Sequence, residues 1–206
     1  ARAFNEMYEL QLNTMGEMNI AFYGEQRTPS RCGRLDQACA FGVMPVNMTF
    51  DGNEVFVDKI KVKKPLYWVF SELNGSKDTV KILSDLNKCY PFAETEIEKN
   101  VQKALGIENE KLIAKATKAI ESGDAEQVGS LMVEAQNMFD SMVAPASPKE
   151  LAAPQLHKVL NDENIKKYTY GAKGVGSQGD GSVQFLAKDE QSQAELIKYI
   201  KDEYNM

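Results

Sequence analysis

The spacing of the apolar residues changes part-way along this chain, and this change limits the folds that it can adopt. Val46, Met48 and Phe50 alternate with polar residues, as in a strand, and residues 51–53 predict a hairpin turn to a return strand over 54–62. Beyond Phe70 the apolar residues mostly recur at helical spacing. Because strands and helices are mixed without regular alternation, we expect an α+β fold in which helices back an antiparallel sheet.

Two helices are predicted before the hairpin. Asn13 and Thr14 offer a start for the first, with Glu17 three residues after Thr14 as in a capping box, and this helix is expected to reach about residue 25. The second is short, covers 33–41 and is closed by Gly42.

Beyond the hairpin, the continuous apolar run at 66–70 is typical of a strand covered on both faces. The methionine-rich stripe from Val128 to Met142 has helical spacing; it can line a ligand groove, but packing in the core is the favoured interpretation. The remaining predictions are a helix from 147 or 148 to 160, strands over 168–173 and 182–187, and a final helix over 193–204.

The composition of the chain excludes several kinds of partner and metal site. The 206 residues include 24 Lys and Arg and 30 Asp and Glu, a formal net charge of −6, so nucleic acid is not an expected partner. No apolar run approaches the roughly 20 residues that cross a bilayer, so no membrane partner is expected either. Three cysteines predict a reducing compartment such as the cytoplasm, and the single His157 excludes a multi-histidine zinc site within one chain.

A glycine-rich segment runs from Gly174 to Gly181 and contains the pattern G-x-G-x-x-G. A dinucleotide-binding loop of this pattern must open into a helix, whereas the residues at 182–186 predict a strand, so we reject that interpretation. Glycines here permit positive φ and close approach of other groups to the backbone. Two interpretations stay open: a loop beside a phosphate site, or a wide hairpin between two strands.

Two carboxylates flank the turn between the predicted helices. Glu25 ends the first helix and Asp36 lies in the first turn of the second, so the turn can bring both into one cleft. Phosphoryl transfer uses one acid to hold a divalent cation and another to accept a hydroxyl proton, and Arg27, Arg31 and Arg34 could balance their charge. By themselves these residues favour a charged corner in which the helix dipole stabilises Asp36.

Taken together, these segments resemble the GHMP kinases, the superfamily of galactokinase and mevalonate kinase. Ala21-Phe22-Tyr23-Gly24-Glu25, with Asp36 eleven residues after Glu25, is similar to the family's magnesium-ligand glutamate and catalytic aspartate. The sequence TPSRCGRLDQ at 28–37 is similar to the galactokinase-type signature, and 173–185 lies where the family has its C-terminal glycine motif. The resemblance covers nearly the whole chain but only the rear part of the family.

The resemblance implies two domains. Residues 1–64 are expected to be the remainder of a GHMP kinase N-terminal domain with its catalytic turn, and residues 65–206 its C-terminal domain. It also implies Asp36 as the catalytic residue and Glu25 as the Mg2+ ligand. The implied substrate contacts are Cys32, Gly33, Arg34 and Gln37. The implied ATP contacts are Gly174, Gly176, Ser177, Gln178 and Gly179.

The implied activity is ATP-dependent phosphorylation of a hydroxyl on a monosaccharide or sugar acid, as in galactokinase or glucuronokinase, with Mg2+. Three alternatives stay open: a mevalonate kinase-like enzyme, a non-catalytic relative that binds a sugar or nucleotide, and a structural fragment. Gln178 and Asp180 depart from the glycines usual in the family's motif, which puts the role of each glycine in question.

The start of the chain carries a further expectation. Ala3, Phe4 and Met7 have helical spacing with no capping residue before them, and the Gly/Ser-rich ATP loop of the family does not occur. We therefore expect a front portion to be missing, to exist as a separate N-terminal fragment, and the chain alone to be inactive. Processing of an initiator methionine is the other explanation.

Overall fold

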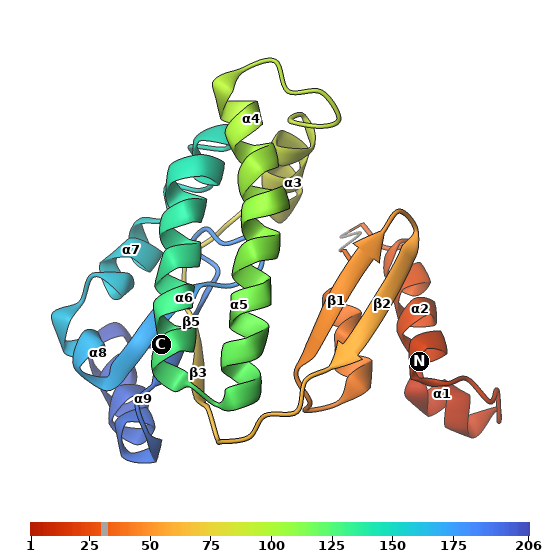
Figure 1. Ribbon diagram of the computed structural model, residues 1–206, viewed down its shortest axis with the longest axis horizontal. Helices are drawn as coiled ribbons and strands as arrows, with labels where there is room; N and C mark the ends of the chain where they lie inside the picture. The colour runs from red at the N-terminus through yellow and green to blue at the C-terminus, as the bar shows by residue number, and fades with distance from the viewer. Residues whose placement is uncertain (30–32) are drawn as a thin grey trace. The chain divides into compact units, whose positions relative to one another are not determined.

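The computed structural model describes residues 1–29 and 33–206, which form two compact units, 1–61 and 62–206 (Figure 1). The first unit contains helices α1 (Arg2–Met7) and α2 (Thr14–Glu25), the 3-10 helix η1 (Asp36–Phe41), and strands β1 (Val46–Asp51) and β2 (Glu54–Lys59). The strands form the predicted antiparallel hairpin, with Asp51 opposite Glu54.

The start of α2 differs in detail from the prediction. The side chain of Asn13 accepts a hydrogen bond from the Gly16 N–H at 2.8 Å, so Asn13 is the cap. Glu17 does not complete a capping box with Thr14; its carboxylate is buried and binds residues of α1 instead. The short helix predicted over 33–41 is a 3-10 helix that begins at Asp36, and Gly42 ends it with a φ of +82°.

The second unit is built on a three-stranded antiparallel sheet with the order β3-β5-β4. The strands are β3 (Tyr67–Glu72), β4 (Thr169–Gly174) and β5 (Ser182–Ala187). Its helices are α3 (Thr79–Asn87), α4 (Glu96–Lys103), α5 (Asn109–Ser122), α6 (Ala125–Met138), α7 (Pro154–Leu160), α8 (Glu163–Tyr168) and α9 (Glu190–Tyr204). Single-turn irregular helices cover Ala104–Glu108, Phe139–Val143 and Ala144–Ala146.

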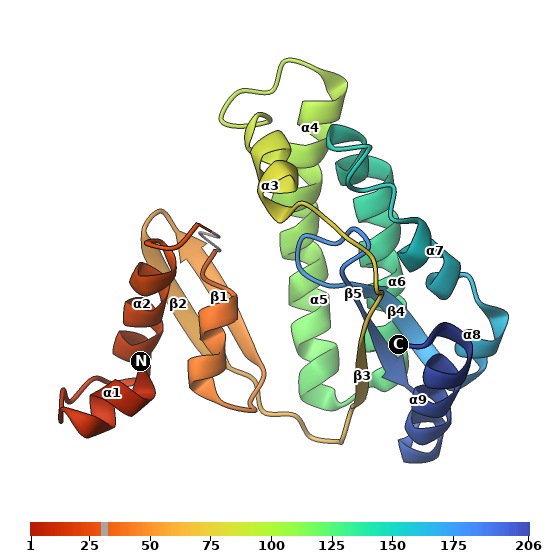
Figure 2. The same cartoon turned by 180° about the vertical axis from the view of Figure 1, so that it is seen from behind.

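Helices cover both faces of this sheet, as the front and back views show (Figures 1 and 2). Successive side chains of the central strand β5 point to opposite faces. Val183 and Phe185 pack with residues of α7, α8 and α9, whereas Leu186 packs with α5 and α6. The unit therefore has the predicted α+β character, with two core layers separated by the sheet.

The methionine-rich stripe is core, as predicted: Val128, Leu131 and Met132 are buried on α6. Two other predictions were wrong. Strand β3 forms, but Phe70 is 64% exposed, so the run at 66–70 is not fully covered on both faces. The helix expected from 147 or 148 begins at Pro154, because the chain turns irregularly until Ala153, whose φ is +46°.

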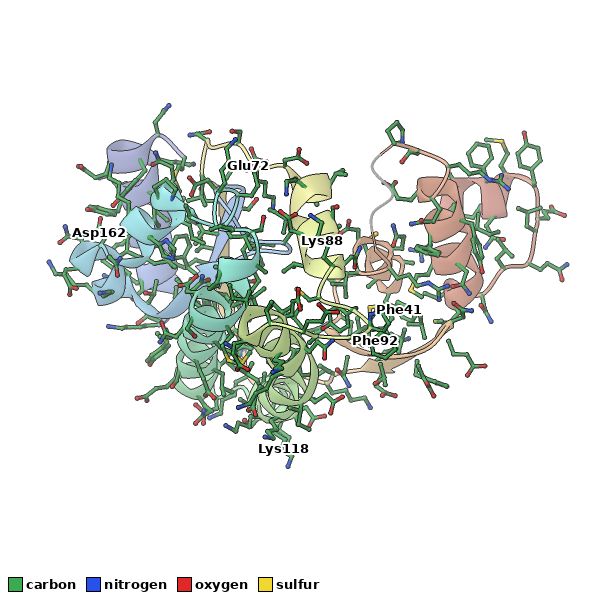
Figure 3. All side chains as sticks on the ribbon, turned by 90° about the horizontal axis from the view of Figure 1, so that it is seen from above. Phe41, Glu72, Lys88, Phe92, Lys118 and Asp162 are labelled. Atoms are coloured by element: carbon green, nitrogen blue, oxygen red, sulfur yellow. The ribbon has the colours of Figure 1, made fainter. Side chains whose placement is uncertain are left out.

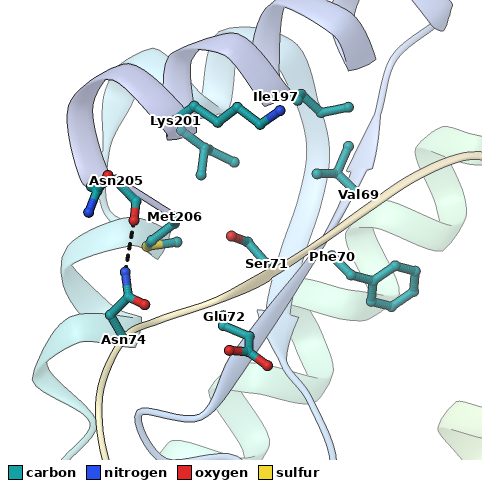
Figure 4. A pocket seen from close by; sticks show the side chains of 10 residues that line it. Val69, Phe70, Ser71, Glu72, Asn74, Ile197, Lys201, Asn205 and Met206 are labelled. Atoms are coloured by element: carbon teal, nitrogen blue, oxygen red, sulfur yellow. Dashed lines mark hydrogen bonds between the residues drawn. The ribbon is translucent and has the colours of Figure 1, made fainter.

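A shallow hollow of about 390 Å³ lies between β3 and the end of α9 (Figure 4). The Asn74 side chain closes one end by donating to the Asn205 carbonyl oxygen at 2.9 Å. Its lining combines apolar side chains with polar ones and with the charged Glu72 and Lys201.

Candidate functional site

Asp36 lies at the mouth of a pocket in the first unit. The 3-10 helix η1 begins at Asp36, which is exposed, and continues with the buried Gln37. Both line a pocket of about 340 Å³. The other lining residues are Ala1, Arg2, Glu17, Ala21, Cys39 and Ala40. Two of the predicted site residues therefore share one concave surface with an ion pair that the sequence analysis did not single out.

That ion pair is formed by Arg2 and Glu17. The Arg2 guanidinium donates to Glu17 Oε2 from Nε at 3.0 Å and from Nη2 at 2.8 Å, and the Asn5 amide donates to Oε1 at 2.9 Å. Arg2 Nη2 also donates to the Ala40 carbonyl oxygen at 2.6 Å, which joins α1 to η1. The hydrogen bonds from Asn5 and then from Arg2 lower the pKa of Glu17.

This network predicts a pH dependence of stability. Because folding lowers the pKa of Glu17 from 4.5, its contribution is fully present above pH 4.5 and is lost as the pH falls through the folded pKa. A Glu17→Gln variant is therefore expected to melt lower than the wild type at pH 7, with the difference shrinking below pH 4.5. Thermal melts of both proteins between pH 3 and pH 7 test this; a constant difference would contradict it.

Arg34 contacts other residues of the first unit. Its guanidinium lies 4.4 Å from the centroid of the Phe22 ring and donates to the Asn53 carbonyl oxygen at 3.1 Å. Gln37, with its amide oriented to satisfy its neighbours, donates to the carbonyl oxygens of Gly33 and Arg34 at 2.9 and 3.2 Å. These contacts hold the segment before η1 against α2 and the hairpin. Cys32, also expected at the substrate, lies outside the described residues.

Glu25 is the last residue of α2 and is half-buried. The Thr28 hydroxyl donates to the Glu25 carbonyl oxygen at 2.8 Å and lies 3.4 Å from its Oε1. Glu25 is not among the described residues that line the pocket at Asp36. This pocket therefore contains Asp36, Gln37 and Glu17, whereas Glu25 is not part of its lining.

The glycine segment is a turn between two strands of the second unit. It leaves β4 at Gly174 and enters β5 at Ser182, so no helix opens from it and the rejection of a dinucleotide-binding loop is confirmed. Gly176, Gln178 and Gly179 have φ near +60°, and Gly179 is buried. The turn is tethered inside by bonds from Val175 N–H to the Ser182 carbonyl oxygen and from Gln178 N–H to the Val175 carbonyl oxygen.

Gln178, one of the two residues that depart from the glycines usual in the family's motif, packs inside the turn. It is 4% exposed, and its Oε1 atom has no hydrogen-bond partner among the described residues. A Cβ on Gly174 would lie 2.7 Å from this oxygen, so a side chain there would have to displace the Gln178 amide. The other departure, Asp180, accepts the Leu156 N–H at 2.9 Å and so joins the turn to α7. Asp180 therefore has a structural role, whereas Gln178 is packed inside the turn with an unpartnered oxygen.

Sequence comparison matches the chain to no protein-family model and to no curated protein. Its structure is similar to three kinds of solved kinase. The L. major mevalonate kinase complexed with R-mevalonate has a TM-score of 0.71 and 20% identity, over 98% of this chain and 58% of that one. The chain has the fold of the GHMP kinases.

The other kinases support the same fold. The Lactococcus lactis galactokinase complexed with galactose has a TM-score of 0.66 and 14% identity over 96% of this chain, and the homoserine kinase of Cytophaga hutchinsonii 0.65 and 15% over 98%. The chain spans about 60% of the length of these proteins. The structural resemblance is therefore to part of a GHMP kinase.

GHMP kinases in general use ATP and Mg2+. Among residues 1–29 and 33–206, no three His, Cys, Asp or Glu side chains form a metal-binding group. Mg2+ that arrives with a nucleotide needs only one or two protein carboxylates, because phosphate and water oxygens complete its shell. Glu25 offers such an oxygen ligand. Over the same residues, no helix is long and apolar enough to cross a membrane.

The ion pair of Arg2 and Glu17 in this pocket was not predicted from the sequence. They lie fifteen residues apart on different helices, so no helical or strand spacing relates them. One signal in the sequence could have indicated a buried Glu17: it is next to Met18, an apolar residue of the same predicted helix, which is fully buried.

Proposed function

We propose that the protein containing this chain transfers the γ-phosphoryl group of ATP to a hydroxyl of a monosaccharide or sugar acid. The observation that carries this proposal is the placement of Asp36 and Gln37 on a concave surface in a chain with the GHMP kinase fold. An exposed carboxylate at a pocket can accept a proton from a bound alcohol. A purely structural role for Asp36 would not call for a pocket beside it.

Each predicted residue has a chemical role in this proposal. Asp36 orients the acceptor hydroxyl and takes its proton as the hydroxyl oxygen bonds to the γ-phosphorus and the bond to ADP breaks. Glu25 would hold Mg2+, and Mg2+ bound there would neutralise charge on the phosphates. The turn from Gly174 to Gly181 supports the phosphates. Most of the rate comes from positioning and electrostatic stabilisation.

The Arg2 and Glu17 pair gives the pocket its shape and electrostatics. Because Arg2 neutralises Glu17, the buried carboxylate adds no net charge beside Asp36. The acceptor therefore meets one exposed carboxylate rather than two. Gln37, whose amide is engaged with backbone, acts by holding the segment that carries Asp36 rather than by contacting substrate.

A mevalonate kinase-like activity is the second candidate, because the L. major mevalonate kinase has the TM-score of 0.71.

We propose a cytoplasmic location, where the three cysteines stay reduced, and an N-terminal segment of the same protein as the partner that completes the ATP site.

The experiment is an acceptor screen with the whole protein, ATP and Mg2+, read by 31P NMR for a new phosphate ester. Galactose and glucuronic acid test the sugar proposal, and mevalonate and homoserine test the alternatives. We expect an ester with a sugar or sugar acid. An ester with mevalonate alone would replace the first candidate by the second, and no ester with any alcohol would contradict both.

A further inference from the structure

Lys77 lies directly against the glycine turn. It directly precedes Asp78, which is the N-cap of α3. A Cβ on Gly181 would lie 2.7 Å from Lys77 Cε and 2.9 Å from Nζ, and a Cβ on Gly179 would lie 3.3 Å from Lys77 Cβ. The absence of side chains at these two positions is therefore what lets the lysine stem and ammonium group lie along the turn.

No carboxylate of residues 1–29 or 33–206 forms an ion pair with Lys77. Among the described residues Lys77 also forms no hydrogen bond, although it is half-buried. Neighbouring lysines differ: Lys81 and Lys88 pair with Asp85, and Lys173 donates to the Gly174 carbonyl oxygen at 2.7 Å. Burial lowers the pKa of Lys77, and nothing within the unit offsets that effect.

Backbone donors converge on the same turn. Within the described residues, no hydrogen bond is donated by the N–H groups of Gly176, Ser177, Gly179, Asp180 or Gly181. Gly179 is buried, so its N–H is not simply a surface donor. Successive free N–H groups in a turn with positive φ form a concave donor surface that suits anions.

We propose that Lys77 and the free N–H groups of the glycine turn bind an oxyanion directly. The ligand is a phosphate of the nucleotide or the carboxylate of a sugar-acid acceptor, which share this chemistry. The inference rests on the proposed function and deepens it. It states that the turn contacts the ligand directly, and that the Lys77 ammonium group supplies the positive charge. An oxyanion supplies the counter-charge that Lys77 lacks and acceptors for the free donors.

The test is calorimetric titration of the 206-residue chain with tripolyphosphate and, separately, with glucuronate, without Mg2+ and at fixed ionic strength. We expect Lys77→Met to weaken binding by about 10-fold to 100-fold, as for one hydrogen bond to a charged group, and Lys77→Arg to retain most of it. Lys88→Met is the matched control, because Lys88 is the C-cap at the far end of α3 and is paired with Asp85 (Figure 3).

The outcomes separate the two ligand sources. Preference for tripolyphosphate assigns the site to the nucleotide, and preference for glucuronate assigns it to the acceptor; both support an oxyanion site. Equal binding by wild type and Lys77→Met, equal losses in Lys77→Met and Lys88→Met, or no binding of either probe would overturn it.

Two further readouts keep the test decisive. If Lys77→Met does not fold, amide shifts of Gly176, Gly179 and Gly181 in the labelled wild type replace it, and unchanged shifts at saturating probe overturn the proposal. Because no phosphoryl transfer is measured, binding that depends on Lys77 can succeed while the acceptor screen fails, and the reverse.

Discussion

Phosphoryl transfer by the whole protein is expected to fall by about 10²-fold to 10⁴-fold when Asp36 is replaced by Asn. The amide has nearly the same shape as the carboxylate but cannot take the hydroxyl proton. Asp36 is exposed at the start of η1, so the substitution leaves the core intact. The KM for ATP is expected to stay close to that of the wild type, because Asp36 acts on the acceptor. Steady-state kinetics at saturating acceptor measure both quantities.

Asp51→Asn is the control for this experiment. Asp51 is an exposed carboxylate of the same unit at the hairpin turn, and it lines no pocket described above. Its loss should leave turnover unchanged, which excludes a general effect of removing one negative charge. Wild-type turnover in Asp36→Asn would remove the catalytic role of Asp36. A rise in the KM for ATP with unchanged kcat would move Asp36 to nucleotide binding.

The second unit is expected to lose about 3 kcal/mol of folding stability when Gly171 is replaced by Ala. A Cβ on Gly171 would lie 2.0 Å from the Gly129 carbonyl oxygen and 2.6 Å from its carbonyl carbon. Both obstructing atoms are backbone atoms of α6, so no side-chain rotation relieves the clash. The helix must move away from β4, which opens the core beneath Val128 and Met132.

Thermal unfolding followed by circular dichroism measures this loss. A loss of 3 kcal/mol corresponds to a decrease in Tm of roughly 6–12 °C for a unit of this size. Gly24→Ala makes the same chemical change in α2, where a Cβ would meet nothing within 4 Å, and is expected to be neutral or slightly stabilising. Equal Tm values for Gly171→Ala and the wild type would show that α6 and β4 are not held at this spacing.

Local structure was largely predictable from the sequence. The hairpin at residues 51–53, the core stripe on α6 and the strands around the glycine turn follow from side-chain period and turn chemistry, which act over a few residues. The spacing of Glu25 and Asp36 likewise placed them at a helix end and a helix start. The two-domain assignment with a boundary near 64 and the individual ATP contacts of the glycine turn stay predictions.

The sequence by itself determined where most helices, strands and turns form, and it placed Glu25 at the end of one helix and Asp36 at the start of the next, because those properties depend on neighbours along the chain. Tertiary structure alone decided that Arg2 neutralises Glu17 beside Asp36, that Arg34 stacks on Phe22, and that Lys77 lies on Gly181. These pairs are separated by 12 to 104 residues, and no periodicity spans such distances. Only the packing of whole elements against one another brings their charges together.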